Sequence, residues 1–350
     1  MNTLVSIATV GDRTALAAHE IHALPVLVIF PHNQCNCRCV MCDIWRIREA
    51  REITPADLEP LLESFRRLGL RWVVFSGGEP QLNQKWSSLA QIFRSAGIRV
   101  TLLTAGLLLK EQAQLVAEVV DDVIVSLDGP PAIHNHIRRV RDAFERLSDG
   151  VTALRQVRPS MPVRARCTVQ KQNCHALRAV VRSAKEIGLN SVSFLAVDFT
   201  SSAFNRPEGW QPDHAGRVVL TSKEVEALVA EVEHLISECR LDFASGFIVE
   251  NPQKLRRIAQ HFRAHLGLAE NVAPRCNAPW VSAVIEASGD VRPCFFHRAL
   301  GNVHRQSFVE IINSREALEF RASLDVSRND TCRRCVCSLY VQQGNDLTNQ

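Results

Sequence analysis

The sequence lacks long hydrophobic runs and dense basic stretches, and each absence argues against a class of protein. The longest apolar run, residues 24–30, is far shorter than the roughly 18 residues that a membrane-spanning helix needs. The N-terminus lacks a basic start followed by a long apolar stretch, so nothing in the sequence suggests secretion. The net charge of +4 over 350 residues is modest for a nucleic-acid surface. We therefore expect a cytoplasmic protein without membrane or nucleic-acid partners.

Cysteine, by contrast, is abundant, with twelve residues in the chain. A reducing compartment disfavours a disulfide framework, and a chain of this length buries a core without covalent crosslinks. The thiols fall into an N-proximal group, a C-terminal group and three isolated residues: Cys35, Cys37, Cys39, Cys42; Cys276, Cys294, Cys332, Cys335, Cys337; and Cys167, Cys174, Cys239. Two groups at opposite ends predict two metal sites, whereas the isolated thiols fit buried small hydrophobes.

The first two hundred residues alternate between short apolar runs and amphipathic stretches. Expected strands are 26–30, 72–76, 99–104, 123–128, 163–169 and 191–197. Expected helices are 54–68, 86–96, 110–120, 132–157 and 176–187, followed by 222–239 and 252–266. Nearly continuous apolar strands are typical of a parallel sheet covered on both faces. The chain is therefore predicted to be an α/β protein, a partial (β/α)6 TIM-like barrel with its functional loops at the carboxyl ends of the strands.

The domain organisation follows from where this alternation begins and ends. Residues 1–23 are an N-terminal extension, 24–200 the barrel, and 201–270 a loop and helical linker. Residues 271–340 form a cysteine-rich domain and 341–350 a tail. The linker begins in a polar stretch, 199–217, that is punctuated by glycine and proline and is of a length usually kept for function.

Cys35, Cys39 and Cys42 form a C-x3-C-x2-C loop directly after the first strand. Four thiolates normally hold an iron–sulfur cluster, so three would leave one iron open to another ligand. Zinc is the alternative, although zinc loops usually pair two C-x2-C elements. The loop resembles the signature of the radical S-adenosylmethionine (SAM) enzymes. The resemblance implies a [4Fe–4S] cluster that chelates SAM and cleaves it to a 5′-deoxyadenosyl radical, which abstracts a hydrogen atom from the substrate. Cys37 departs from the pattern, and its role stays open.

Further segments resemble cofactor-binding positions of the same family. Gly77, Gly78 and Glu79 follow the second strand and resemble the Gly-Gly-Glu-Pro motif that contacts the methionyl amino group. Two glycines permit close backbone approach to a ligand, and a carboxylate accepts hydrogen bonds from an ammonium group. The resemblance extends this cofactor-binding set to Ser126, Asp128, Arg164, Arg166 and Asn173. A helix cap at Asp128 and a solvated arginine pair are the alternatives, and His134, His136 and Arg138 match a His-x-x-x-Arg stretch that is equally consistent with solvation.

The second thiol group begins with C-x12-G-x4-C. Its spacing predicts a β-hairpin over 281–286 and 291–295, with Gly289 supplying the positive φ of the turn. The hairpin would bring Cys276 and Cys294 together, and Cys332 and Cys335 would complete a four-thiolate site after a helix near 309–318. Zinc competes here on ligand type. The segment resembles the SPASM/Twitch extension of radical SAM enzymes, which implies one auxiliary [4Fe–4S] cluster with Cys337 left over.

The substrate is not fixed by this resemblance. The resemblance implies that the auxiliary cluster takes an electron from the substrate radical, which favours an oxidative reaction. The expected substrate is a small metabolite, such as an amino sugar, a nucleoside or a polyol, and a flavodoxin or ferredoxin is the expected electron donor. Only about two dozen residues precede the first strand, which is too few for a leader-binding module, so a peptide maturase ranks second. A zinc-bearing binding protein is the alternative of another class. Cys167 or Cys174 would return a hydrogen atom if either faced the substrate, but a buried spectator thiol is the simpler interpretation.

Metal content separates the iron–sulfur and zinc hypotheses. Two [4Fe–4S] clusters predict a brown protein that carries about eight irons and no stoichiometric zinc after anaerobic reconstitution. Elemental analysis and absorbance spectroscopy measure this directly. One zinc per chain without iron would contradict the prediction.

Overall fold

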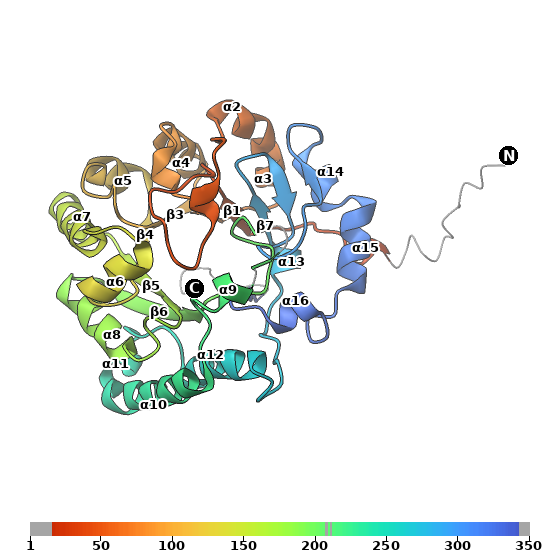
Figure 1. The fold of residues 1–350 in the computed structure, drawn as a ribbon. Helices are drawn as coiled ribbons and strands as arrows, with labels where there is room; N and C mark the ends of the chain where they lie inside the picture. Colours follow the sequence, from red (N-terminus) through yellow and green to blue (C-terminus); the bar gives the residue numbers. More distant parts are fainter. Residues whose placement is uncertain (1–15, 207–208, 211, 343–350) are drawn as a thin grey trace.

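The computed structural model describes residues 16–206, 209–210 and 212–342, and its centre is one nine-stranded sheet (Figure 1). The spatial order of the strands is β6-β5-β4-β3-β2-β1-β7-β8-β9. The first six strands are parallel: β1 (Val26–Ile29), β2 (Trp72–Phe75), β3 (Arg99–Thr104), β4 (Asp122–Ser126), β5 (Val163–Val169) and β6 (Ser191–Ala196). These strands confirm the six predicted from the apolar runs, and the predicted partial TIM-like barrel is confirmed with them.

The two faces of the barrel sheet differ in burial. In β5, Ala165 and Cys167 are buried on the outer face, whereas Arg164, Arg166 and Thr168 on the inner face are half-buried. Successive side chains of a strand point to opposite faces, so the outer face packs under the helices and the inner face lines the barrel interior. The open face of an incomplete barrel explains why polar side chains are tolerated there.

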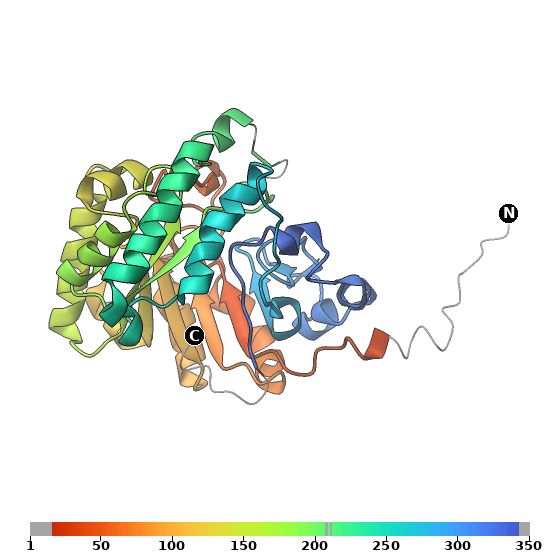
Figure 2. The ribbon, with the colours of Figure 1, turned by 90° about the horizontal axis from the view of Figure 1, so that it is seen from below.

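Helices cover the outside of this sheet, as Figure 1 shows. Those that match single predicted helices are α4 (Trp86–Ser95), α5 (Ala113–Val119), α8 (Leu177–Glu186), α10 (Ser222–Glu238) and α12 (Pro252–His265). Helices α10 and α12 lie side by side (Figure 2). Five short helical segments occur in the loops: η1 (Ile44–Arg46), η3 (Pro80–Leu82), α9 (Pro212–Ala215), α11 (Arg240–Ala244) and α13 (Ala278–Val281). No described helix is long and apolar enough to cross a membrane.

Three helices that the sequence predicts as continuous are interrupted. The predicted helix 54–68 is divided into α2 (Pro55–Leu58), η2 (Glu59–Leu61) and α3 (Leu62–Arg67), because Pro60 has no N–H for a helical hydrogen bond. The predicted helix 132–157 is divided into α6 (Pro131–Arg138) and α7 (Ala143–Val157), because Arg139 adopts a left-handed conformation with φ of 52°. The third, 309–318, becomes α14 (Phe308–Ile312) and α15 (Arg315–Ser323), with Ser314 capping α15.

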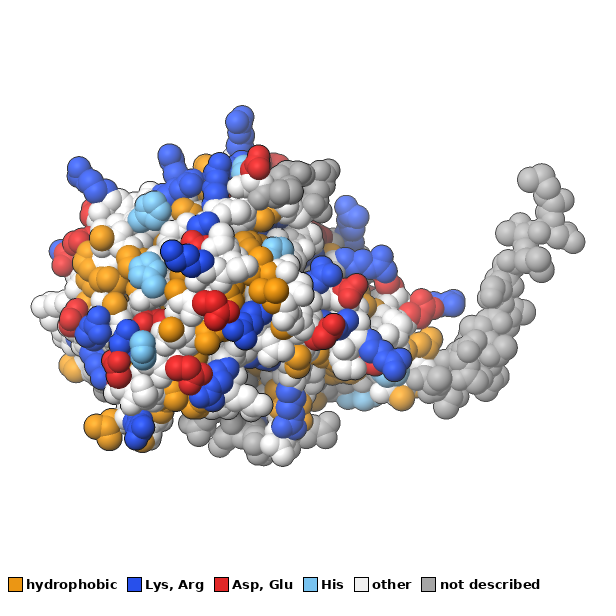
Figure 3. Space-filling view, turned by 60° about the horizontal axis from the view of Figure 1, so that its bottom comes forward, with side chains coloured by type: hydrophobic (Ala, Val, Ile, Leu, Met, Phe, Trp, Pro, Cys, Tyr) orange, Lys and Arg blue, Asp and Glu red, His pale blue; other side chains and the backbone are white. Residues whose placement is uncertain are grey.

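The strands of the C-terminal domain extend the barrel sheet. Strand β7 (Ser282–Ile285) pairs in parallel with β1 over four residues and antiparallel with β8 (Asp290–Arg292), which pairs with β9 (Gly301–Asn302). The predicted hairpin is confirmed, and Gly289 in its turn has φ of 83°. A last short helix, α16 (Asp330–Arg333), carries Cys332, and Cys335 and Cys337 follow it. On the surface shown in Figure 3, acidic and basic side chains are interspersed.

Strand β1 lies between the two parts of the sheet, paired with β2 on one edge and with β7 on the other. Leu27 is fully buried between β2 and β7. We expect Leu27→Ala to lower the free energy of unfolding by about 2–5 kcal/mol, because the deletion leaves a cavity in a packed core. Chemical denaturation of the cluster-loaded protein measures this loss.

Leu241→Ala is the matched control, because Leu241 is 84% exposed. Its effect should stay within about 0.5 kcal/mol. Equal losses in the two variants would contradict the central position of β1.

Candidate active site

The N-proximal cysteines lie on the loop that leaves the carboxyl end of β1. Cys39 is buried, and Cys35 and Cys42 are half-buried. The loop is held against the end of α6, since the N–H groups of Arg38 and Val40 donate to the carbonyl oxygens of Arg138 and Ile137. The last carbonyls of a helix have no partner within the helix, so the loop satisfies them while being fixed in place.

The environment of each thiol shows why Cys37 stands apart. Cys37 is buried in an apolar pocket with Ala105, Leu107 and Ala143, and hydrogen bonds with Cys35 and Cys39 raise its pKa. The hydrogen bond from Cys37 and the nearby Arg138 charge lower the pKa of Cys39 to about 7. Burial raises the pKa of Cys42, and the negative charge of Cys39 adds to the rise. Several thiols crowded in a dry loop are costly to ionise unless a cationic metal core binds them, which fits an iron–sulfur ligand set.

The Gly-Gly-Glu turn packs directly under the cysteine loop. A Cβ on Gly78 would stand 2.0 Å from the Gln34 carbonyl oxygen, and one on Gly77 would stand 2.6 Å from Phe30. The glycines are therefore needed for the approach of two chain segments. Glu79 is buried and accepts hydrogen bonds from Thr104 Oγ1 at 2.8 Å and from the Ala105 N–H at 2.9 Å. Burial raises the pKa of Glu79, and these donors act in the opposite direction.

Asp128 and Asn173 lie at the carboxyl ends of β4 and β5, and both are fully buried. One carboxylate oxygen of Asp128 accepts hydrogen bonds from Arg138 Nε at 2.7 Å and from its Nη2 at 2.6 Å. Asn173 Nδ2 donates to the carbonyl oxygens of Asp128 and Thr168. These two polar side chains position the loops around the site, and direct contact with the cofactor stays a prediction. Ser126, on the inner face of β4, is half-buried.

The structure shows the surroundings of three further predicted residues. Arg164 and Arg166 share the inner face of β5, as alternation predicts, but Arg164 pairs with Asp122 at the amino end of β4, away from the cysteine loop. This ion pair gives Arg164 a structural partner, and its contact with the cofactor stays a prediction. Cys167 is fully buried on the outer face, and Cys174 is buried with its sulfur 3.4 Å from the Lys171 carbonyl oxygen. Both positions fit the buried spectator thiol that the sequence favoured, and the return of a hydrogen atom by either thiol stays a prediction.

Arg166 lies on the inner face of β5, and its Nε donates a hydrogen bond to Ser193 Oγ of β6 at 3.3 Å.

The polar loop after β6 holds the cysteine loop from the other side. Within its described part, the Asn205 side chain donates to the Asp43 carbonyl oxygen at 3.0 Å, and Trp210 Nε1 donates to the Asp43 carboxylate at 2.6 Å. Arg206 is buried, is paired with Asp198 at 2.6 Å, and stacks between Phe204 and Trp210. The sequence marked this loop as functional but not these contacts, because no local pattern reveals which distant segment a loop touches.

The C-terminal thiols also come together. Burial raises the pKa of Cys294 to about 12, and the charges of Cys276 and Cys332 contribute to that rise. Burial likewise raises the pKa of Cys335, with added repulsion from Cys337, Cys294 and Cys276. The four predicted ligands are therefore close enough to interact.

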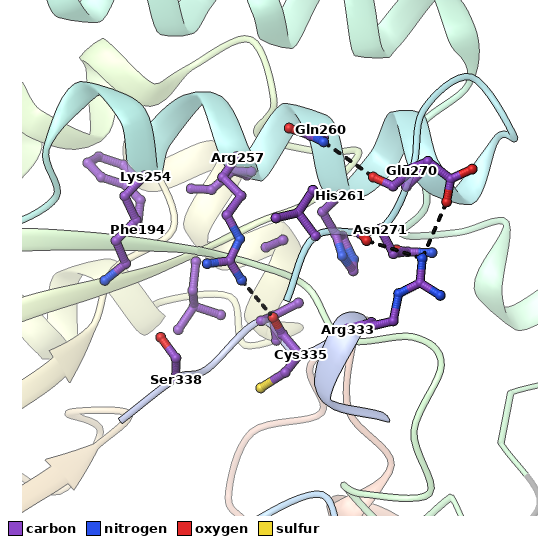
Figure 4. A pocket seen from close by; sticks show the side chains of 16 residues that line it. Phe194, Lys254, Arg257, Gln260, His261, Glu270, Asn271, Arg333, Cys335 and Ser338 are labelled. Atoms are coloured by element: carbon purple, nitrogen blue, oxygen red, sulfur yellow. Dashed lines mark hydrogen bonds and ion pairs between the residues drawn. The ribbon is translucent and has the colours of Figure 1, made fainter. Parts of the chain in front are cut away.

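A histidine that the sequence did not single out contacts this second group, since His297 Nε2 lies 3.5 Å from Cys332 Sγ. Figure 4 shows the neighbouring contact with α12, in which Arg257 donates to the Cys335 carbonyl oxygen and Arg333 pairs with Glu270. The Cys332–Cys335 segment is thus anchored to the barrel.

In the part of the chain that the structure describes, no three His, Cys, Asp or Glu side chains converge as ligands of a single metal ion. A four-iron cluster takes each thiolate at a different iron and so needs no such convergence. Both donor sets consist of thiols, the ligand type that iron–sulfur clusters take. Fold and thiol sites together define an iron–sulfur enzyme built on an incomplete α/β barrel.

Comparison with known proteins agrees with this class. The Radical SAM superfamily model matches residues 29–170, and a model described as an iron–sulfur cluster-binding domain, SPASM, matches residues 276–336. Residues 29–170 therefore form a radical SAM domain, and residues 276–336 form a C-terminal SPASM domain. Its cofactors are [4Fe–4S] clusters and S-adenosylmethionine, and the zinc-bearing binding protein considered above is not supported.

Three curated relatives share 24–31% identity with this chain over the aligned residues. Fe-coproporphyrin III synthase of Methanosarcina barkeri is 24% identical over 328 residues, which cover 89% of this chain and 80% of the relative. AdoMet-dependent heme synthase of the same organism is 31% identical over 159 residues, 44% of this chain and 45% of the relative. Pre-heme d1 synthase of Dinoroseobacter shibae is 27% identical over 210 residues, 59% and 50% of the two chains.

Solved structures share the fold at lower identity. Streptococcus suis SuiB bound to its precursor peptide SuiA has a TM-score of 0.63 at 18% identity, covering 97% of this chain and 80% of SuiB. AnSMEcpe with bound AdoMet has a TM-score of 0.63 at 20% identity, covering 89% and 86% of the two chains. At these identities the likeness shows the fold alone.

The contrast between Cys39 and Cys37 tests the assignment of the cluster-binding trio. We expect Cys39→Ala to lose the N-proximal cluster and to form no 5′-deoxyadenosine, because a thiolate ligand is removed. Cys37→Ala, the matched variant two residues away, should keep both the iron content and the formation of 5′-deoxyadenosine. Iron analysis and chromatography of the reaction products measure the two effects. Loss of the cluster in Cys37→Ala with retention in Cys39→Ala would reverse the assignment.

Proposed function

We propose that this radical SAM enzyme oxidises a small, carboxylate-bearing metabolite in a cavity between the barrel and the SPASM domain. When bound, the N-proximal cluster and S-adenosylmethionine supply the 5′-deoxyadenosyl radical that abstracts a hydrogen atom. The auxiliary cluster is suited to accept the electron that the substrate radical loses when it becomes the oxidised product. The cavity is the observation that carries this proposal.

The cavity has a volume of about 620 Å³, within the range of roughly 300–1,000 Å³ that small-molecule sites occupy. Gly77 and Gly78 line it on the side of the cysteine loop. The turn of the β7–β8 hairpin, with Glu286 and Arg292, lines the opposite side. A ligand bound there would lie between the two cysteine sites, where hydrogen abstraction and electron removal both need it.

The lining combines aromatic rings with guanidinium groups. Phe295 lies 5.4 Å from Phe30 and 5.1 Å from Phe204, measured between ring centroids. Arg292 is half-buried and pairs with Glu286 at 2.7 Å, and Arg51, which also lines the cavity, pairs with Glu49 at 3.1 Å. Aromatic faces favour a flat apolar body, and guanidinium groups bind carboxylates in bidentate geometry. Such a lining suits a ring system with acidic side chains better than a neutral polyol.

The names of the relatives favour the same chemistry. Fe-coproporphyrin III synthase aligns over most of this chain, and heme and pre-heme d1 synthases align over parts of it. These names describe tetrapyrroles, whereas the amino sugars, nucleosides and polyols considered first have no support from those three. We therefore place a tetrapyrrole carboxylate ahead of them as the substrate class. A peptide substrate has only the fold of SuiB and anSMEcpe behind it.

A substrate panel tests this proposal. The anaerobically reconstituted enzyme is given S-adenosylmethionine and dithionite with a tetrapyrrole carboxylate, an amino sugar, a nucleoside or a peptide. We expect 5′-deoxyadenosine to rise at least about tenfold over the substrate-free level with the tetrapyrrole only. Deuterium from labelled substrate should appear in the 5′-deoxyadenosine. Turnover of the peptide or the sugar without the tetrapyrrole would refute the proposal.

Two controls sharpen this experiment. Fe-coproporphyrin III should bind, as followed by its absorbance, at least about tenfold more tightly than its methyl ester, because the ester cannot pair with guanidinium groups. Cys294→Ala should cleave the cofactor but form no oxidised product, because the auxiliary site alone is damaged. Equal binding of acid and ester would contradict carboxylate recognition.

A further inference from the structure

Arg138, at the end of α6, directs its guanidinium group into the protein interior, contrary to the solvated alternative that the sequence left open. Only 7% of Arg138 is exposed, and its partner Asp128 is fully buried. Nε and Nη2 hold one carboxylate oxygen of Asp128 at 2.7 and 2.6 Å. The remaining nitrogen, Nη1, lies 3.8 Å from Cys39 Sγ. One side chain thus joins a buried carboxylate to a cluster-binding sulfur.

The surroundings prevent Arg138 from leaving this position. The other carboxylate oxygen of Asp128 accepts a hydrogen bond from the Thr168 N–H at 3.1 Å, which ties Asp128 to β5. His134 is fully buried beside the pair, and burial lowers its pKa to about 4, so it is neutral and cannot replace the arginine charge. Withdrawing Arg138 would leave the Asp128 charge alone in a dry interior, which is strongly unfavourable.

An ion pair built only for stability would not need the third nitrogen to face a ligand sulfur. Hydrogen bonds to the sulfurs and the local net charge set the reduction potential of an iron–sulfur cluster. Reduction adds negative charge, so a donor and a cation beside a thiolate favour the reduced form, and a bare carboxylate disfavours it. Arg138 and Asp128 therefore act on the same cluster with opposite signs.

We propose that Arg138 sets the reduction potential of the cluster held by Cys35, Cys39 and Cys42, by donating to Cys39 Sγ, and that Asp128 positions it and offsets its charge. Another cation beside this loop, Arg206, acts on Cys42 and is itself paired with Asp198. The proposal concerns electron entry and holds whichever substrate the cavity binds.

Substitution of each partner moves the potential in opposite directions. Arg138→Gln removes the cation and leaves Asp128 unpaired, so the reduced-to-oxidised ratio at a fixed poise should fall about tenfold, equivalent to ~59 mV for a one-electron couple. Asp128→Asn leaves the arginine charge uncompensated and should raise the ratio by a similar factor. The double variant should return towards the wild-type value. A purely structural pair predicts loss of cluster in both variants and no opposite shifts.

Two further variants separate charge from disruption. Arg138→Lys keeps the charge but not the fork that reaches both partners, so its shift should be smaller than that of Arg138→Gln and in the same direction. Arg139→Gln removes an exposed cation from the next residue and should leave the potential unchanged. If Asp128→Asn fails to fold, the graded series at Arg138 against Arg139→Gln decides the question.

The measurement is a redox titration of the cluster-loaded enzyme followed by electron paramagnetic resonance. Addition of S-adenosylmethionine perturbs only the signal of the N-proximal cluster and so identifies it beside the auxiliary one. Variants are compared at equal iron content. Equal potentials in wild type, Arg138→Gln and Arg138→Lys would overturn the proposal. So would a change confined to the affinity for S-adenosylmethionine, which would make Arg138 a cofactor-binding residue instead.

Discussion

The backbone ladder on both edges of β1 is the constraint on which the rest of the structure depends. Val26–Ile29 pairs in parallel with β2 on one side and with β7 on the other, residue for residue over its whole length. The cysteine loop leaves the carboxyl end of this strand, and the hairpin between Cys276 and Cys294 begins with its neighbour. A ladder of hydrogen bonds, rather than a hinge, therefore fixes the two thiol sites relative to each other. The same pairing brings the Gly77–Gly78 turn and the β7–β8 hairpin turn to the one cavity that both line.

Buried carboxylate–guanidinium pairs complete the arrangement around the cysteine loop. The pair Asp128–Arg138 supports the cysteine loop from the side of α6. The pair Asp198–Arg206 stabilises the loop after β6, whose Asn205 and Trp210 donate hydrogen bonds to Asp43. Such pairs cost desolvation and are weak evidence for added stability. Their benefit here is geometric, because each guanidinium group has several donors. Arg138 joins α6 to Asp128 and to Cys39, whereas Arg206 holds its own loop in shape by donating to the carbonyl oxygens of Ala203 and Asp198.

The sequence was sufficient for the features that repeat or are local. Apolar runs located all six barrel strands, and the turn at Gly289 located the hairpin. Cysteine spacing predicted two sites, and the structure brings Cys294 near Cys276 and Cys332. The contacts between distant segments of the chain could not be predicted from the sequence. Alternation placed Arg164 on the correct face but could not show its pairing with Asp122, and it could not show that Cys167 faces the helices. The pairing of β7 with β1, and the roles of Arg138 and His297, depend on contacts between segments far apart in the chain.

The two thiol sites differ in how a nitrogen approaches a sulfur, and this difference bears on their tasks. At the N-proximal site the donor is a charged guanidinium group in a dry interior, balanced by a carboxylate. At the C-terminal site the nitrogen is Nε2 of His297, 3.5 Å from Cys332 Sγ, and burial lowers the pKa of this imidazole. Burial thus disfavours the charged form of His297, whereas the ion pair at the N-proximal site acts through two opposed charges that single substitutions can unbalance. Two clusters of the same kind can thus be held at different potentials by one short stretch of α6 and one residue after β8.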